Sequence, residues 1–203
     1  MPTAALLVVL FGAVVGGMVW FASAPTVVPL EEIEGLGVNA LPAPRAIADF
    51  ELVHHTGRSF TRHDLEGRWS FLFFGYASCP DICPITMSIM GQAEQLLEGD
   101  AFQGVLVSVD PRRDSIDVIA EYVGAFSASF VGVTGQTTDI ETFAHNLGIG
   151  FRVPDESLPA DYLVEHSPYI VIVDPSARHF GYIKPPFDPN KLALTYRSLV
   201  AAQ

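Results

Sequence analysis

Apolar residues recur along the chain with two periods that predict strands and helices in turn. Apolar runs of strand length occupy residues 70–76, 104–109, 130–133 and 169–173. Helical spacing of apolar residues occupies residues 84–97, 116–126, 138–147 and 189–202. Strands that alternate with helices in this way are typical of an α/β fold. Two shorter stretches, residues 50–53 and 58–60, predict a β-hairpin in front of these elements.

The first 24 residues contain an apolar segment that predicts a membrane anchor. No charged residue precedes Glu31, and the apolar run is long enough to insert into a bilayer as a helix. Residues 22–24, Ala-Ser-Ala, resemble a signal-peptide cleavage site, so removal of the segment is the alternative. No basic residue precedes the run, and Pro25 would follow the cut. We therefore expect a retained single transmembrane helix at residues 1–24.

Prolines and glycines at residues 25–45 predict a linker between this anchor and one soluble domain at residues 46–203. The length of that domain suits one hydrophobic core rather than two. Acidic residues soon after the anchor fit a soluble domain on the periplasmic or outer side of a cytoplasmic membrane. The formal net charge of −12 excludes a generic nucleic-acid binder, which would carry a basic face.

The chain has two cysteines, Cys79 and Cys83, and both follow the buried strand predicted at residues 70–76. Each precedes a proline, which disfavours helical backbone, so we expect both in a loop, with Cys83 as the N-cap of a helix that begins at Pro84. A thiol there faces free N–H groups, which predicts a lowered thiol pKa. Two such thiols serve either redox exchange or a soft metal such as Cu(I) or Zn. The flanking prolines disfavour a third interpretation, two inert buried cysteines.

Three segments resemble the signature motifs of the Sco/SenC family of membrane-anchored, thioredoxin-like copper chaperones. They are Phe-Phe-Gly-Tyr-Ala-Ser-Cys-Pro-Asp-Ile-Cys-Pro at residues 73–84, Ser-Val-Asp-Pro-Arg-Arg-Asp at 108–114 and Tyr-Leu-Val-Glu-His-Ser at 162–167. The resemblance extends from about residue 47 to the C-terminus. It implies a thioredoxin-like fold with the hairpin as an N-terminal extension. It also implies a copper site made by Cys79, Cys83 and His166.

Some residues near these motifs need separate comment. Three residues depart from the family pattern: Ala77, Arg112 and Glu165 stand where the family commonly has Thr, Glu and Asp. The change at Glu165 leaves open whether this residue orients His166. The helical spacing of Met87 and Met90 favours core filling over copper ligation. Asp81 is interpreted as a turn former. A proline at the position of Pro168 is often cis in thioredoxin relatives, so Pro168 is a candidate for a cis bond.

The resemblance implies a copper metallochaperone, which is not an enzyme, that delivers copper to the Cu-A centre of cytochrome c oxidase subunit II. Cu(I) is the expected cargo, with Cu(II) left open. The alternative is a thiol–disulfide oxidoreductase that uses Cys79 and Cys83 to reduce the cysteines of the Cu-A site or another dithiol partner. A peroxidase is a third hypothesis, but Ala77 and Ser78 offer no match to the Thr expected beside a peroxidatic thiolate.

Overall fold

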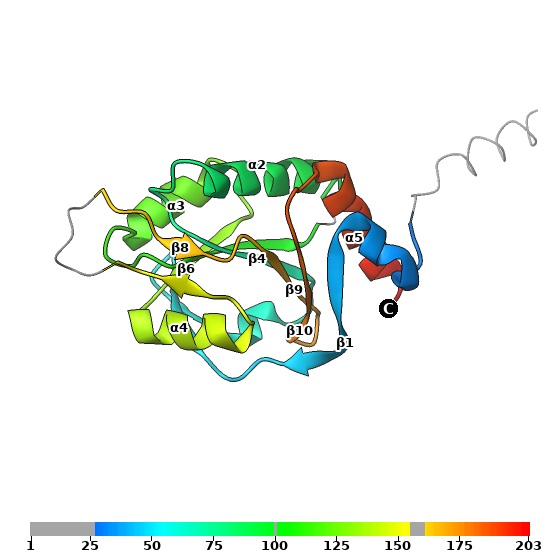
Figure 1. Cartoon of the computed structure of the whole chain (residues 1–203), viewed down its shortest axis with the longest axis horizontal. Helices are drawn as coiled ribbons and strands as arrows, with labels where there is room; N and C mark the ends of the chain where they lie inside the picture. The colour runs from blue at the N-terminus through cyan, green and yellow to red at the C-terminus, as the bar shows by residue number, and fades with distance from the viewer. Residues whose placement is uncertain (1–26, 100, 155–160) are drawn as a thin grey trace, which may run out of the picture.

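The computed structural model describes residues 27–99, 101–154 and 161–203. Figure 1 shows them as one mixed β-sheet with helices on both faces. Within these ranges, no helix is long and apolar enough to cross a membrane. The anchor predicted at residues 1–24 lies outside the described residues.

Three parallel strands form the centre of the sheet: β4 (Ser70–Gly75), β5 (Gln103–Ser108) and β6 (Val131–Thr134). Helices α2 (Ile82–Gln95) and α3 (Ile116–Gly124) connect them and lie on the same face of the sheet (Figure 1). Every residue of β4 is buried, because helices cover both of its faces. This burial explains why β4 is a continuous apolar run rather than an alternating one.

Antiparallel strands extend the sheet on both sides of this centre. The strand order is β1-β10-β9-β4-β5-β6-β2-β3. On the β4 side, from the centre to the edge, these strands are β9 (Ile170–Val173), β10 (Arg178–Ile183) and β1 (Val38–Ala46). At the other edge, the predicted hairpin is present as β2 (Glu51–His54) and β3 (Ser59–Thr61), and β2 pairs with β6. The hairpin therefore belongs to the main sheet.

The remaining elements complete the two helical layers and a small second sheet. Helix α5 (Pro189–Ala201) lies beside α2, whereas α4 (Thr137–Asn146) lies on the opposite face of the main sheet (Figure 1). A 3-10 helix, η2 (Arg62–Leu65), follows the hairpin. Two short strands, β7 (Phe151–Arg152) and β8 (Glu165–His166), pair only with each other. The α/β class predicted from the sequence is thus confirmed.

The segment expected to be a linker, residues 25–45, is largely part of the fold. It contains a second 3-10 helix, η1 (Leu30–Leu36), and most of β1, which pairs antiparallel with β10. Ile33 and Val38 are buried in the main core. The prolines of β1 lie between Ala40 and Arg45, where the pairing register shifts. An edge strand tolerates proline because its outer N–H groups need no partner. The structured domain therefore begins before residue 46, which corrects the predicted boundary.

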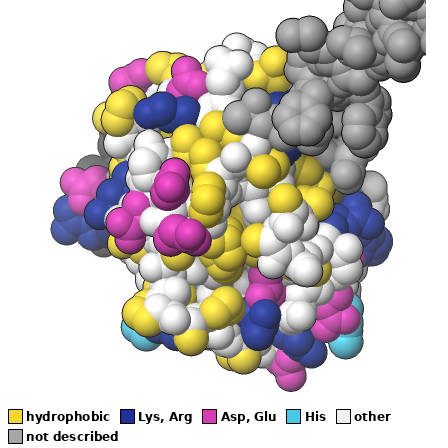
Figure 2. All heavy atoms as spheres, turned by 90° about the vertical axis from the view of Figure 1, so that its right-hand side faces the viewer, with side chains coloured by type: hydrophobic (Ala, Val, Ile, Leu, Met, Phe, Trp, Pro, Cys, Tyr) yellow, Lys and Arg dark blue, Asp and Glu magenta, His cyan; other side chains and the backbone are white. Residues whose placement is uncertain are grey.

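The face at the right of Figure 1 is formed where η1 meets α5. Figure 2 shows acidic side chains gathered on this face beside a band of apolar ones. Glu31, Glu32 and Glu34 of η1 are exposed, and so are Leu30 and, on α5, Val200. Part of the net negative charge of the sequence thus lies on this face of the folded domain.

Candidate metal centre

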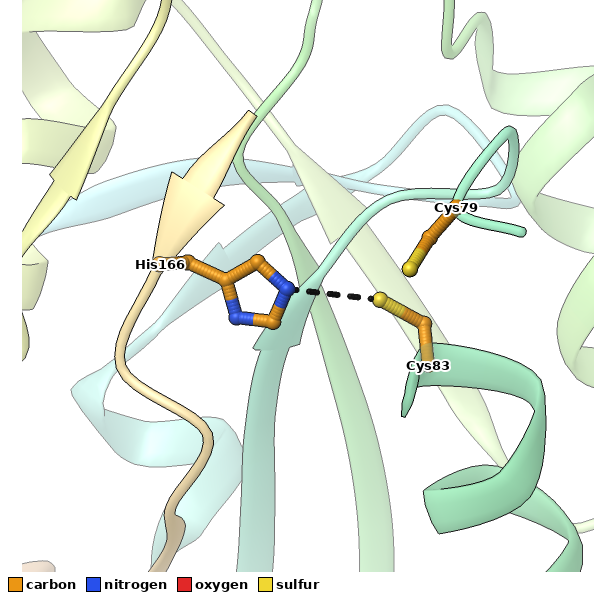
Figure 3. A group of neighbouring side chains, drawn as sticks. All are labelled: Cys79, Cys83 and His166. Carbon is orange, nitrogen blue, oxygen red and sulfur yellow. Dashed lines mark hydrogen bonds between the residues drawn. The ribbon is translucent and has the colours of Figure 1, made fainter. Parts of the chain in front are cut away.

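Three side chains from distant parts of the chain converge at one end of the sheet. Cys79 and Cys83 follow β4, and His166 is the last residue of β8. Their ligand atoms all lie within 4.8 Å of one another. Figure 3 shows the two sulfurs and the imidazole pointing toward a common space. Among the described residues, these three are the Cys, His, Asp or Glu side chains that lie close enough together to share a metal ion.

Helix α2 begins earlier than the sequence predicted. Its N-cap is Asp81, so Cys83 lies in the first helical turn and only Cys79 lies in the preceding loop. The predictions that both cysteines lie in a loop and that Cys83 is the N-cap are therefore wrong. The reason is that Pro84 also falls in the first turn, where backbone N–H groups have no partner within the helix.

The environment of Cys83 differs from the predicted one as well. Its side chain is fully buried, and both cysteines are free thiols. Burial is the largest cause that raises the pKa of the Cys83 thiol, and the neighbouring Cys79 raises it further. The lowering expected at a helix start is therefore wrong. Loss of hydration here outweighs the backbone hydrogen bond at Tyr76, which acts to lower the pKa of Cys83. A metal cation between the sulfurs would reverse this balance, because coordination deprotonates a thiol.

His166 presents its Nε2 atom to the cysteines. This atom lies 3.4 Å from the Sγ atom of Cys83, and Nδ1 lies 3.3 Å from the carbonyl oxygen of Ser167. When Nδ1–H donates to that carbonyl, the Nε2 lone pair is directed at the sulfurs. Burial lowers the pKa of His166, so the ring is neutral at neutral pH. The imidazole is thus in the form that binds metals.

The role left open for Glu165 is not supported by its position. Its side chain is 75% exposed, and its carboxylate pairs with Arg152 at 2.8 Å. Instead, two aromatic rings pack edge-to-face on the imidazole, with centroid distances of 5.7 Å for Phe73 and 6.0 Å for Tyr76. The backbone carbonyl of Ser167 and these two rings orient His166, and their roles were not predicted from the sequence.

Gly75, the last residue of β4, has a packing role that the sequence also did not indicate. A Cβ atom on this residue would lie 2.8 Å from the Phe73 ring and 3.0 Å from the Sγ atom of Cys83. Real Cβ atoms essentially never approach other heavy atoms below about 3.0 Å without a shift of their neighbours. Glycine therefore leaves the space that the Cys83 side chain occupies.

Other residues discussed from the sequence lie outside the group. Met87 and Met90 are fully buried in the hydrophobic core, which confirms their interpretation as core residues. Asp81 is exposed and makes no side-chain cap hydrogen bond. The five further histidines all lie in described ranges, and none joins the three ligand atoms: His54, His55, His63, His145 and His179.

The prediction of a cis bond at Pro168 is wrong. Among the described residues, the cis peptide bond is that between Pro185 and Pro186. The chain before Pro168 is held by Ser167, whose backbone N–H donates to the carbonyl oxygen of Gly150 at 2.8 Å. The Ser167 hydroxyl donates to the same carbonyl at 3.2 Å. These two bonds tie the segment before β9 to Gly150, the residue before β7.

The donor set and its spacing fit one soft metal ion. At a metal–sulfur distance of about 2.3 Å, known for zinc, three donors arranged in a plane around one ion lie roughly 4 Å apart. The three ligand atoms, all within 4.8 Å of one another, are close to that spread before any metal enters. Two thiolates with one imidazole favour Cu(I) or Zn over hard cations such as Mg²⁺.

The chain belongs to the SCO1/SenC family, because the model of that family matches residues 39–201. A Stutzerimonas stutzeri protein named for copper binding is 36% identical over 157 residues, which cover 76% of this chain and 76% of that protein. The human mitochondrial protein SCO2 homolog is 32% identical over 138 residues, which cover 66% of this chain and 52% of that protein.

Solved structures with this fold include two proteins with copper bound. The crystal structure of yeast Sco1 with copper bound matches with a TM-score of 0.73 at 29% identity and covers 79% of this chain and 91% of that one. The Arabidopsis thaliana ScoI structure with copper bound matches with a TM-score of 0.71 at 28% identity and covers 78% of this chain and all of that one. The mixed sheet described above is therefore the thioredoxin-like α/β fold of this family.

Proposed function

We propose that this protein is a membrane-anchored metallochaperone that binds one copper ion through Cys79, Cys83 and His166. It delivers this copper to the Cu-A centre of cytochrome c oxidase subunit II. The observation that carries the proposal is the convergence of two sulfurs and one imidazole nitrogen within 4.8 Å of one another. Names of related proteins and titles of solved structures that specify copper support the choice of metal.

The number of donors favours copper in transit over a structural zinc ion. Structural zinc sites are almost always closed by four protein ligands. Within residues 27–99, 101–154 and 161–203, the group holds three, and no fourth Cys, His, Asp or Glu joins it. Cu(I) accepts a low coordination number and soft sulfur ligands. A three-donor site keeps one direction open for a ligand of the acceptor, which delivery requires.

Exposure of the two cysteines suggests an order for the transfer. Cys83 is completely buried, whereas 9% of Cys79 is exposed. An acceptor thiolate would therefore replace the Cys79 sulfur on the copper first, and the Cys83 sulfur and His166 afterwards. Each step exchanges one copper–ligand bond for another and leaves the oxidation state of Cu(I) unchanged. The two released cysteine thiolates take up the protons that two incoming thiols lose, and His166 is released as the neutral imidazole.

The site of action follows from the sequence and remains part of the proposal. The uncharged segment before residue 25 would hold the protein in the cytoplasmic membrane. The copper-binding domain would face the periplasmic or outer side, where the Cu-A domain of the acceptor lies according to the family resemblance. A carbonate wash of membranes from cells that express the full chain tests the anchor. Recovery of a soluble form that starts at Pro25 would show cleavage instead.

The full chain, purified in detergent with reduced thiols, should bind one Cu(I) in a competition titration with a chromophoric Cu(I) chelator. When two equivalents of the loaded chain are mixed with the copper-free Cu-A domain of subunit II, whose centre holds two copper ions, copper should move to that domain. The purple absorption of Cu-A should then appear once an oxidant is supplied. Stoichiometric copper binding without transfer would reject delivery to this acceptor. Failure to bind copper would reject the proposal as a whole.

A thiol–disulfide oxidoreductase is the second candidate, because Cys79 and Cys83 are adjacent free thiols. Exchange needs a reactive thiolate, however, and burial raises the pKa of Cys83. The metal-free reduced chain can be mixed with an oxidised Cu-A domain to test this reaction. Reduction of its disulfide at a rate that Cys79→Ser abolishes and His166→Ala leaves unchanged would favour the oxidoreductase.

A further inference from the structure

The backbone alone holds the segment that carries His166 rather weakly. Strand β8 has two residues and pairs only with β7, in a sheet separate from the main one. Residues 161–164, which precede β8, belong to no strand. A metal ligand must nevertheless be held close to its productive position. Side-chain contacts are therefore needed to place this segment against the main sheet.

Tyr162, four residues before His166, is held by two side chains of the loop after β5. Its hydroxyl donates to Oδ1 of Asp110 at 2.7 Å. Its carbonyl oxygen accepts a hydrogen bond from Nη1 of Arg113 at 3.0 Å. The guanidinium carbon of Arg113 also lies 3.8 Å from the centroid of the Tyr162 ring. Both the side chain and the backbone of Tyr162 are thus fixed.

Asp110 and Arg113 fix each other as well. Nε of Arg113 donates to Oδ2 of Asp110, so each carboxylate oxygen has its own partner. Asp110 is completely buried, and 9% of Tyr162 is exposed. Charge-assisted hydrogen bonds in such a place are short and directional, because little water competes for them. Asp110 comes two residues after β5, a central strand of the main sheet, so this cluster stands on a rigid base.

A second contact continues this connection to the metal-binding group itself. The backbone N–H of Val164 donates to the hydroxyl of Tyr76 at 3.3 Å. The Tyr76 ring packs edge-to-face on His166, and the guanidinium of Arg113 lies 5.4 Å from the centroid of the same ring. Tyr76 directly follows β4 and precedes Cys79 by three residues. The His166 segment is therefore tied to the part of the chain that carries the first cysteine.

We propose that Asp110, Arg113 and Tyr162 form a clamp that sets the position of His166 relative to Cys79 and Cys83. The three are positioning residues, since none of them supplies one of the ligand atoms. The clamp acts on the segment before the histidine, whereas the Ser167 carbonyl acts on the ring itself. This inference rests on the proposed copper function. It assigns a role to residues that the sequence motifs contain but do not explain.

Tyr162→Phe tests the clamp because it keeps the ring and removes the hydroxyl that bonds Asp110. In the full chain, one Cu(I) should still bind, with an affinity roughly tenfold lower, the lower end of the effect expected for partners outside the ligand set. X-ray absorption of the loaded variant should show a weakened imidazole contribution. Tyr182→Phe, on β10, is the matched control and should leave both quantities unchanged. Tyr182 stacks on Tyr169 rather than on the clamp.

Wild-type affinity together with a wild-type imidazole contribution in Tyr162→Phe would overturn the proposal. A fall in thermal stability with unchanged copper affinity would overturn it too, because the clamp would then be only structural. If the wild-type chain itself bound no copper, the proposed function would fail. The clamp would then be tested separately, in the metal-free chain. Amide hydrogen exchange at residues 161–166 should then be faster in Tyr162→Phe than in Tyr182→Phe, and equal rates would reject the clamp.

Discussion

The Nε2 atom of His166 lies 3.4 Å from the Sγ atom of Cys83, although 83 positions separate the two residues in the sequence. With the His166 Nδ1–H directed to the carbonyl of Ser167, the Cys83 thiol donates its proton toward Nε2. Both groups are therefore neutral and already paired before a metal enters. A copper ion that binds here takes the place of the proton between them.

Copper affinity should rise with pH. Burial raises the pKa of Cys83, so this thiol is protonated at neutral pH and copper must displace its proton. By linkage, the apparent association constant should increase roughly tenfold per pH unit for each proton displaced. Burial also lowers the pKa of His166, so the imidazole does not compete for a proton near neutrality. Competition titrations with a Cu(I) chelator from about pH 6 to pH 8 measure this slope. An affinity independent of pH would contradict the proposed thiolate ligand.

In cells, His166→Ala should impair Cu-A-dependent oxidase activity about as strongly as Cys79→Ser. Delivery needs all three donors, whereas dithiol exchange needs only the cysteines. Added copper should partly restore the activity of the His166→Ala strain. His145→Ala, an exposed histidine on α4, is the matched control and should behave as the wild type. Normal oxidase in His166→Ala, with loss in the cysteine variant, would favour the oxidoreductase.

Gly181→Ala should destabilise the domain by about 1–3 kcal/mol, the usual cost of overpacking. Its Cβ would lie 2.4 Å from the carbonyl oxygen of Asn39 and 2.8 Å from Cα of Ala40, both backbone atoms of β1. Gly124→Ala, at the end of α3, is the control, since nothing lies within 4 Å of its Cβ. Urea denaturation of both variants gives the comparison. Equal stabilities would show that β1 does not pack closely on β10.

The sequence predicted the elements whose signal is local. The continuous apolar run that becomes β4 and the helical spacing of α2 both reflect burial that the structure confirms. The sequence predicts a linker where β1 lies, because Pro42 and Pro44 are typical of breaks in regular structure and the pairing with β10 is not visible in the sequence. The sequence does not predict β10, because the residues of this strand include His179 and Gly181, which carry little strand signal alone.

The candidate site was predicted in part. The two cysteines stand out through their spacing, but spacing alone left redox chemistry and metal binding open. The family motif singles out His166 among the six histidines, and the structure brings it to the sulfurs. The burial of Cys83 and the contacts of Tyr162 with Asp110 depend on tertiary packing. No local pattern contains that information.

The free energy of unfolding should fall as the pH drops below about 6.5, the ordinary pKa of a histidine side chain. Burial, with Arg45 nearby, lowers the pKa of His179 in the folded state. The unfolded chain therefore binds a proton at a higher pH than the folded one, and the stability that His179 contributes at neutral pH is lost as the pH falls from its unfolded toward its folded pKa.

His179→Leu should make this decline shallower without abolishing it, because the pKa values of His54, His55 and His166 are lowered as well. Urea denaturation of the metal-free chain at several pH values measures the slope. A His179→Leu slope equal to that of the wild type would show that His179 titrates normally in the folded protein.

Copper K-edge X-ray absorption of the Cu(I)-loaded full chain tests the central claim most directly, because it reports which atoms bind the metal. The account predicts two sulfur donors and one imidazole nitrogen. In His166→Ala the imidazole contribution should disappear, whereas in His145→Ala it should remain. An imidazole signal that persists in His166→Ala, or a third sulfur from a methionine such as Met87, would contradict the site formed by Cys79, Cys83 and His166.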